Sequence, residues 1–575
     1  MARTVAATTK VAQVRQKAWK PKVKTGCTTC RIRRVKCDEA KPSCQRCVST
    51  GRKCDGYTAA PSRQTQAIVC GPQTSSIASV MQGLNLDSFE EQEAFHFYQY
   101  HSSTELSGLF DSGFWKFEVL LAAQTTPAIR HAVTSLAAMH RKYATGHSSV
   151  VPDDPSDRYL RFALVQSNRA IQEIVSAPGH GTIADKITMI TYCILFHCLA
   201  TLQGHQKTAI QHLRGGIRIL REIDEEIGSS PVDLGSHPVS LHTVRGMLID
   251  MDVQARGVMS EADQKKWEPP PRRGLQVTRA PFQTFFHARY YMETTLNDMV
   301  QLVKSVGQRQ PKAKESIELV LAEYTRLRNQ YLAGGVLLDE FLADPKNNAD
   351  KRVALGIQLT YTLGHIFINA FSRWVPEKND WAIDHRNPDP PGWRHDPFKE
   401  IELERILAVI MSLCTDLLEE QRRVGRSSQV RPYFSSGSGV LGGLWIVASV
   451  SKDPARRRKA IEMLRANPRR EGLWDSVVAG EIAQQVLTLE EETAKQGCAN
   501  SEADPEIVCR LETSWTEARP LAGKSLLAYQ GEEAHSHLIR DVAITYNEER
   551  KATIEFRNVK QLKMGERGLF KRIEW

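Results

Sequence analysis

Apolar residues recur at helical spacing along most of the chain from residue 89 to residue 530. One helix is expected to start at Pro127, because Thr126 can serve as its N-cap and proline fits the first helical position. The apolar faces of this helix and of two later ones have residues three or four positions apart. These faces are Ile129, Ala132, Val133, Leu136, His140 and Tyr143; Tyr159, Phe162, Ala163, Ala170, Ile171 and Ile174; and Ile210, Leu213, Ile217 and Leu220. The pattern predicts a large all-helical domain.

The pattern changes to a period of two near the C-terminus. Apolar residues alternate with polar ones from Val542 to Tyr546 and again from Ala552 to Phe556, on either side of Asn547–Arg550. Alternation on both sides of a polar segment predicts a β-hairpin with a four-residue loop. We expect this hairpin to pack on the helical domain.

Three other segments interrupt or extend the helical pattern. The apolar run Ile187–Leu202 contains His197 and is short for a bilayer span, so it predicts a buried helix and no membrane partner. Proline-rich stretches at 269–271 and 376–397 predict surface loops. Residues 58–88 are rich in Ser, Thr, Gln, Gly and Ala and predict a flexible linker. This linker has no apolar heptads, so whether the protein is a homodimer stays open.

Six cysteines near the N-terminus form a repeated pattern, in which Cys-x2-Cys-x6-Cys occurs twice. They are Cys27, Cys30, Cys37, Cys44, Cys47 and Cys54. Thiolates suit zinc, and six of them can complete two tetrahedral sites if two sulfurs bridge the ions. A single zinc site would leave two cysteines unused, and a disulfide framework would require a secreted protein, whereas the N-terminus does not resemble a signal peptide. We therefore expect two zinc ions per chain.

Positive charge is concentrated on this cysteine module and the arm before it. Residues 1–60 contain 15 Lys and Arg against 3 acidic residues, a net charge of +12, which leaves residues 61–575 at −2. Such a patch attracts phosphate by releasing counterions, so we expect double-stranded DNA as a partner. The basic residues between Arg15 and Lys24 also suit a nuclear localisation signal, which predicts a protein of the nucleus.

The stretch TGCTTCRIRRVKCDEAKPSCQRCVSTGRKCDGY, Thr25–Tyr57, resembles the zinc binuclear cluster of fungal transcription factors. The resemblance implies that Cys27 and Cys44 bridge the two zinc ions. It also implies that one ion is completed by Cys30 and Cys37 and the other by Cys47 and Cys54.

The first half of the repeat is basic, whereas the four residues directly after Cys47, Val48–Gly51, are weakly charged. The resemblance implies that a short helix of the first half enters the major groove over a CGG triplet. The expected DNA-binding residues are Lys24, Arg31, Arg33, Arg34 and Lys36. Arg34 takes the place of the family's base-reading lysine, and its guanidinium can bind guanine O6 and N7 together. The alternative, that Arg34 contacts only phosphate, stays open.

Four short segments of the helical region resemble the second class of fungal-specific transcription factor domain: Thr104–Trp115, Pro127–His140, His212–Leu220 and Pro468–Ser476. The expected organisation has five parts. They are a basic arm (1–24), the zinc cluster (25–57), the linker (58–88), a helical regulatory domain (89–530) and the C-terminal hairpin (531–575).

Enzyme motifs are weak or missing. GSGVLG at 437–442 satisfies GxGxxG, but no βαβ alternation surrounds it, so we expect a glycine-rich loop before a buried helix that starts near Val440. The acidic stretch 474–512 fits either a surface that recruits the transcriptional machinery or a solvated helix face. We predict a sequence-specific transcription regulator acting with RNA polymerase II, pathway-specific and not an enzyme. A zinc-stabilised adaptor or repressor is the alternative.

Overall fold

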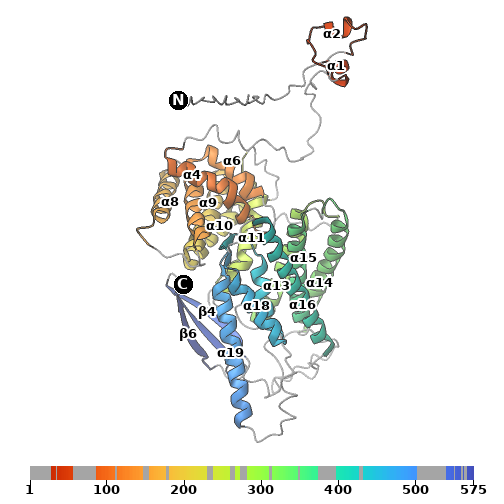
Figure 1. Ribbon diagram of the computed structural model, residues 1–575. Coiled ribbons are helices and arrows are strands. Elements are labelled where there is room, and N and C mark those ends of the chain that lie inside the picture. The colour runs from red at the N-terminus through yellow and green to blue at the C-terminus, as the bar shows by residue number, and fades with distance from the viewer. Residues whose placement is uncertain are drawn as a thin grey trace, which may run out of the picture. The chain divides into compact units, whose positions relative to one another are not determined.

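The chain forms two compact units, Met1–Ile77 and Ala78–Trp575. Their elements are drawn in Figure 1, a computed structural model. The structure describes residues 27–33, 35–55, 86–109, 113–146, 154–176, 181–228, 237–259, 266–271, 281–309, 314–347, 350–372, 397–425, 431–500, 539–548, 551–558, 561 and 566–574. The basic arm, residues 58–85 of the predicted linker and the proline-rich stretch 376–396 lie outside these residues, and Ser88, at the end of the predicted linker, is the N-cap of the first helix of the second unit.

The first unit contains two short helices, α1 (Thr28–Ile32) and α2 (Gln45–Val48). The second unit is mostly α-helical, as predicted. Its first group of helices is α4 (Phe89–Phe97), η2 (Tyr98–Ser102), α5 (Ser103–Leu106), η3 (Phe114–Glu118), α6 (Val119–Thr125), α7 (Pro127–Thr145), α8 (Arg158–Ser176), α9 (Ile183–Gln203), α10 (Gln206–Ile227) and α11 (Leu241–Val258). Residues from all of these elements form one hydrophobic core. Helix α7 starts at Pro127, as the sequence indicates.

Two further cores follow along the chain. One is built mainly by α13 (Phe285–Arg309), α14 (Lys314–Ala343) and α15 (Lys351–Ser372). The other is built by α16 (Pro397–Gly425), α17 (Val440–Val450), α18 (Pro454–Ala466) and α19 (Ser476–Asn500) together with the C-terminal strands. The second unit is therefore a helical assembly with three apolar clusters.

A small sheet corrects the expectation that the large domain is all-helical. Its strands are β1 (Tyr433–Ser435), β2 (Arg469–Glu471) and β3 (Trp474–Asp475), with β1 parallel and β3 antiparallel to β2. Phe434 of β1 is buried in the first core, and Trp474 packs against both the first and the last core. Strands of two or three residues are too short to show an alternating pattern, which is why periodicity missed them.

The C-terminal strands β4 (Ile539–Glu548), β5 (Lys551–Asn558) and β6 (Leu569–Glu574) form a second, antiparallel sheet. The predicted hairpin is confirmed, with Val542 opposite Phe556 and Ile544 opposite Ile554, and Phe556 is buried in the core of α16–α19. Two details were wrong. Glu548 pairs with Lys551, so the loop is shorter than four residues, and β6 adds a third strand.

The apolar helix faces are mostly buried, with one exception. The predicted residues of α7 and three of the four on α10 are buried, but Ile171 of α8 is 46% exposed.

The segment at Pro269–Pro271, predicted as a surface loop, is partly packed against the helices. Pro270 is buried, and the carbonyl oxygens of Pro269 and Pro271 accept hydrogen bonds from Arg221 and Arg245.

Among the described residues, one helix, α9, is long and apolar enough to cross a membrane by length and composition alone. Of its most apolar window, 61% is buried in the protein. His197 lies inside this core and bonds through Nδ1 to the carbonyl oxygen of Ala209 at 2.9 Å. The helix is a core element, as predicted from its length and its histidine.

Candidate metal centre and nucleic-acid interface

The structure brings all six N-terminal cysteines together. Cys27, Cys30, Cys44 and Cys47 are completely buried, and Cys37 and Cys54 are partly buried against them. Two groups of four have their Sγ atoms within 4.8 Å of one another. One group is Cys27, Cys30, Cys37 and Cys44, and the other is Cys27, Cys44, Cys47 and Cys54. Cys27 and Cys44 belong to both groups.

The spacing of the sulfurs fits tetrahedral zinc. The Sγ atoms of Cys27 and Cys44 are 3.6 Å apart, and Cys30 Sγ lies 3.7 Å from Cys44 Sγ. Zinc–sulfur bonds of about 2.3 Å in a tetrahedron place the sulfurs about 3.8 Å apart. Backbone N–H groups also face the sulfurs, as Cys30 N does toward Cys27 Sγ at 3.4 Å. Such donors favour the thiolate form that a metal ion requires.

Burial among the other thiols raises the pKa of Cys30 well above its usual value. A cluster of buried thiols without a cation would therefore stay protonated, held together only by weak S–H contacts. A divalent ion supplies the charge that makes thiolates favourable in this site, so ligation and folding of the module are coupled.

Three side chains that sequence reasoning did not single out hold the module in shape. The Asp38 carboxylate accepts hydrogen bonds from the backbone N–H groups of Gln45 and Arg46, at 3.1 and 2.8 Å, at the start of α2. These bonds and the one from Ala40 N lower the pKa of Asp38. Thr29 Oγ1 donates to Asp55 Oδ2 at 2.8 Å, which ties α1 to the last cysteine. In the sequence, the contacts of Asp38 could have been inferred from the presence of an acidic residue directly after Cys37.

The basic residues predicted to contact DNA are distributed around α1. Arg31 is in the helix, and Arg33 and Lys36 follow it. The Arg33 guanidinium donates to Thr50 Oγ1 at 3.3 Å, so it links the two halves of the repeat. Lys36 is exposed, as is Ile32. Lys24 and Arg34 lie outside the described residues.

The helix in the second half of the repeat ends in a turn that contains a glycine. The second helix, α2, is followed by a turn in which Gly51 has a φ of 65° and Arg52 N donates to Cys47 O at 3.0 Å. Glycine adopts this left-handed conformation without the steric cost that a side chain adds. Gly51 therefore lies in the turn that follows the helix, two positions beyond the C-cap residue Ser49.

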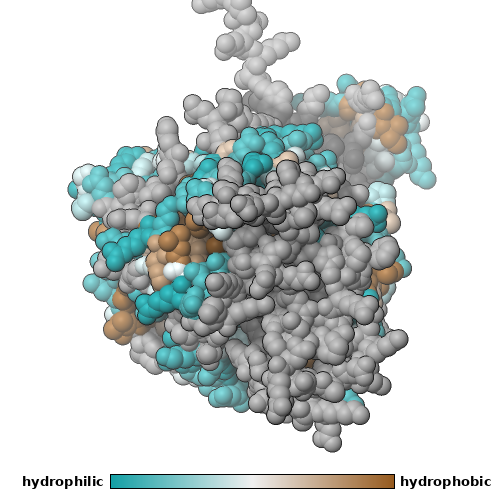
Figure 2. Space-filling view, turned by 90° about the horizontal axis from the view of Figure 1, so that it is seen from below, coloured by the Kyte–Doolittle hydropathy of each residue, from teal (hydrophilic) through white to brown (hydrophobic). Residues whose placement is uncertain are grey.

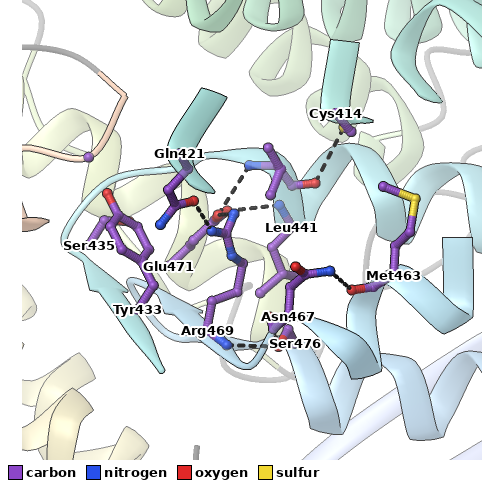
Figure 3. Close-up of polar contacts among 12 residues, drawn as sticks. Cys414, Gln421, Tyr433, Ser435, Leu441, Met463, Asn467, Arg469, Glu471 and Ser476 are labelled. Carbon is purple, nitrogen blue, oxygen red and sulfur yellow. Dashed lines mark hydrogen bonds and ion pairs between the residues drawn. The ribbon is translucent and has the colours of Figure 1, made fainter. Parts of the chain in front are cut away.

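The GSGVLG segment has a structural role in the large unit. Helix α17 begins at Val440, as predicted, and its first free N–H groups point at the Glu471 carboxylate (Figure 3). Val440 N and Leu441 N donate to Glu471 at 3.1 and 2.9 Å, and Arg469 Nη1 lies 3.3 Å from the same carboxylate. The helix N-terminus that a dinucleotide phosphate would need is occupied by this buried side chain.

The first part of the acidic stretch is a packed helix. Ile482 and Val486 of α19 are buried. Glu481 pairs with Arg465 at 2.6 Å, and Glu490 pairs with Arg457 at 2.9 Å. Glu481 and Glu490 of α19 therefore bind the basic helix α18, and residues 501–512 lie outside the described residues.

Comparisons with known proteins agree with this architecture. The fungal Zn(2)-Cys(6) binuclear cluster domain matches residues 25–64, and the fungal specific transcription factor domain matches residues 93–250. The second match covers the helices of the first hydrophobic core. Pro468–Ser476 lies beyond it, yet Arg470 in this segment donates to the carbonyl oxygens of Thr201 and Leu202 at the end of α9.

Curated relatives are transcription regulators. The aspercryptin biosynthesis cluster-specific transcription regulator atnN of Emericella nidulans is 25% identical over 562 residues, covering 82% of this chain and 88% of the relative. The transcription regulator lscL of Purpureocillium lilacinum is 30% identical over 33% of this chain and 48% of its own length. The transcriptional regulatory protein moc3 of Schizosaccharomyces pombe is 48% identical over 60 residues, 10% of this chain and 12% of its own. No solved structure matches the chain.

The chain therefore combines the two domains of fungal zinc-cluster transcription factors. Its domains and relatives are those of DNA-binding transcription regulators and not those of enzymes.

Proposed function

We propose that this protein binds two zinc ions through its six N-terminal cysteines and uses the resulting module to read CGG-type sites in nuclear DNA. The observation that carries the proposal is the pair of four-sulfur groups sharing Cys27 and Cys44. Six sulfurs in this arrangement can serve two tetrahedral ions, and a single ion would leave two sulfurs unused. The zinc ions have a structural role, which is to hold α1 and its basic residues in place.

The basic residues of the first half divide into two roles in this proposal. Arg34 reads guanine, because a guanidinium can bind O6 and N7 together, and Lys24, Arg31, Arg33 and Lys36 contact or approach phosphate. The Arg33 guanidinium also donates to Thr50 Oγ1, which restricts its position. In this proposal Arg34 sets the preference for a DNA sequence, and the other four residues set the overall affinity for DNA.

The test measures binding of the full, zinc-loaded chain to a CGG duplex and to a scrambled duplex at several salt concentrations. We expect Arg34→Ala to cost about 1–3 kcal/mol on the CGG site and to flatten the preference at a guanine. Lys24→Ala should weaken binding to both duplexes equally and make the salt dependence shallower. Lys53→Ala, at an exposed residue of the second half, is the charge-matched control for sequence preference.

Unchanged discrimination in the Arg34→Ala variant would disprove its base-reading role. Zinc-loaded protein with no salt-dependent affinity for any duplex would favour the alternative, an adaptor or repressor that acts through protein contacts alone.

We also propose that the helical unit is the regulatory part of a pathway-specific transcription factor. Two observations support this: its match to the fungal specific transcription factor domain and the end-to-end similarity to a cluster-specific regulator. Fused to an unrelated DNA-binding module, residues 89–575 should change expression of a reporter gene. Residues 474–515 alone should be weak or silent, because the acidic side chains of α19 serve its packing. A long fusion that is well expressed, nuclear and inert under every growth condition would oppose this role.

A further inference from the structure

The C-terminal sheet has two edges of different character. Its outer strands are β4 and β6, because the strand order is β4–β5–β6. Strand β4 lies against α19, where Ile539 N donates to the buried Glu490 carboxylate at 3.1 Å. Strand β6 pairs with β5 alone among the described strands, and Figure 1 shows it on the side of the sheet away from α19. Within the described part of the chain, one edge is therefore covered and the other is open.

The open edge is held in a fixed position. All 6 residues of β6, Leu569–Glu574, pair with β5 in one continuous register from Phe556 to Lys551. Directly before the strand, Gly568 N donates to Glu555 Oε1 at 2.9 Å, and a side chain at Gly568 would overlap the carbonyl oxygen of Phe556. In an antiparallel pair, alternate residues of an edge strand turn their N–H and C=O groups away from the partner. Strand β6 therefore presents a preformed row of backbone donors and acceptors.

The apolar side chains on this edge are only partly covered. Leu569 and Phe570 are 53% and 48% exposed. Leu569 lies opposite Phe556, which is 1% exposed, so the core-facing row of the sheet continues to the edge and is left open there. A further strand would cover both exposed residues, because neighbouring strands pack their side chains side by side on each face. Figure 2, seen from below, shows a hydrophobic patch bordered by hydrophilic residues on the left, the side on which Figure 1 places this sheet.

The charge at this edge is basic, in contrast to the rest of the helical unit. Residues 551–575 contain 7 Lys and Arg against 3 acidic residues, a net charge of +4, which leaves residues 61–550 at −6. Lys571 and Arg572 lie in the middle of β6 and are exposed. If two β6 strands paired antiparallel along their whole length, Lys571 of one would lie opposite Arg572 of the other, and like charges in these positions repel. The edge charges thus oppose pairing of β6 with itself and favour an acidic strand.

We propose that β6 is a docking edge for an acidic, extended segment of another protein, which joins the sheet as a fourth strand. Apolar residues of that segment lie opposite Leu569 and Phe570, and acidic residues lie opposite Lys571 and Arg572. In this mode of binding, backbone hydrogen bonds supply affinity and side chains supply selectivity. Duplex DNA would use the two basic residues but not the apolar pair, so a peptide fits the edge better. The proposal does not depend on DNA binding by the cysteine module.

Binding of a fluorescein-labelled peptide, TEEVITEEVIT, to the full, zinc-loaded chain tests this edge by fluorescence anisotropy at physiological salt. We expect the Lys571→Glu Arg572→Glu variant to bind roughly ten-fold more weakly than wild type, because two attractive cross-strand contacts become repulsive. The matched control is Lys346→Glu Lys351→Glu, at two exposed lysines where α14 connects to α15. It changes the net charge equally and should bind the peptide like wild type. Equal affinity of all three chains would overturn the proposal.

Two measurements on the wild-type chain do not depend on how well a variant folds. The peptide TEEVPTEEVPT should not bind, because proline cannot donate to a strand ladder. Hydrogen exchange of the β6 amides should slow when TEEVITEEVIT is added. Equal binding of the two peptides, or unchanged exchange in β6, would overturn the proposal. So would a Lys571→Glu Arg572→Glu variant that loses affinity for duplex DNA but not for the peptide, because the edge would then be a nucleic-acid contact.

Discussion

The cysteine module and the helical unit are stabilised by different forces. In the described part of the module the buried apolar residues are cysteines, while Ile32 and Val48 are 76% and 62% exposed. In the helical unit three clusters of aliphatic and aromatic side chains are buried, with ion pairs enclosed between them. The comparison indicates that the module depends on metal ligation for its stability, whereas the helical unit is stabilised mainly by burial of apolar side chains.

Removing zinc should have the largest effect, and it should act on the module alone. A strong chelator added to the full chain is expected to abolish DNA binding, since structural zinc contributes roughly 10–16 kcal/mol to such modules. The thermal transition of the helical unit should not move. Metal analysis before chelation should give about two zinc ions per chain, as two tetrahedral sites require.

Single cysteine variants sharpen this prediction. Cys27→Ser and Cys44→Ser should each damage zinc binding at least as much as Cys37→Ser, because their sulfurs belong to both groups. One zinc per chain in the wild type would contradict the two-ion site, and a shifted helical transition after chelation would contradict the independence of the two units.

Breaking a buried ion pair should have the next largest effect, and this effect should be confined to the helical unit. Glu490 and Arg457 are 2.9 Å apart with side chains 0% and 3% exposed, and Glu490 also accepts a hydrogen bond from Ile539 of β4. Glu490→Gln should lower the free energy of unfolding by about 3–5 kcal/mol, because it leaves the arginine buried without its counter-ion.

The neighbouring pair provides the control for this measurement. Glu491 and Arg458 are adjacent in the same two helices but are 38% and 58% exposed. Glu491→Gln should therefore change the free energy of unfolding by about 0–1 kcal/mol. If the two substitutions lowered the free energy of unfolding equally in chemical denaturation, burial would not determine how much the Glu490–Arg457 pair contributes to stability.

Protonation of a buried histidine should have the smallest effect on stability, and this effect depends on pH. Burial lowers the pKa of His197 to about 4, below the unfolded value near 6.5. The unfolded chain then binds the proton more tightly, so stability is full above about pH 6.5 and falls as pH decreases toward 4. The loss is at most about 3 kcal/mol, at roughly 1.4 kcal/mol for each pKa unit. His197→Gln should flatten this part of the stability profile while zinc content at pH 8 stays unchanged; an identical slope in the variant would assign the effect to other groups.

Much of the candidate site could be predicted from the spacing of the cysteines, because these ligands lie close together in the sequence. The six cysteines lie within 28 consecutive positions, so their chemistry can be read without knowledge of the tertiary structure. The side chains that support them were harder to find. Asp38 and Thr29 act through backbone and side-chain contacts to residues several to many positions away, and no repeat marks them.

Helical periodicity placed several of the helices but not their partners. The start of α7 at Pro127, the start of α17 at Val440 and the C-terminal hairpin were predicted from local pattern. Ile171 was misplaced for an instructive reason. An apolar residue at helical spacing indicates burial against something, and the sequence does not say whether the partner lies in the same chain.

The sequence by itself determined the mostly helical class, the two-part architecture and the cysteine pattern, because each rests on residue spacing over short distances. Tertiary structure decided the contacts of Glu471 with the start of α17 and the pairing of β1 with β2, since these join segments 30 or more positions apart. It also showed that Glu481 and Glu490 of α19 bind α18 and that Ile171 of α8 is exposed. Contacts between distant segments depend on the packing of all three cores, and local pattern does not encode that packing.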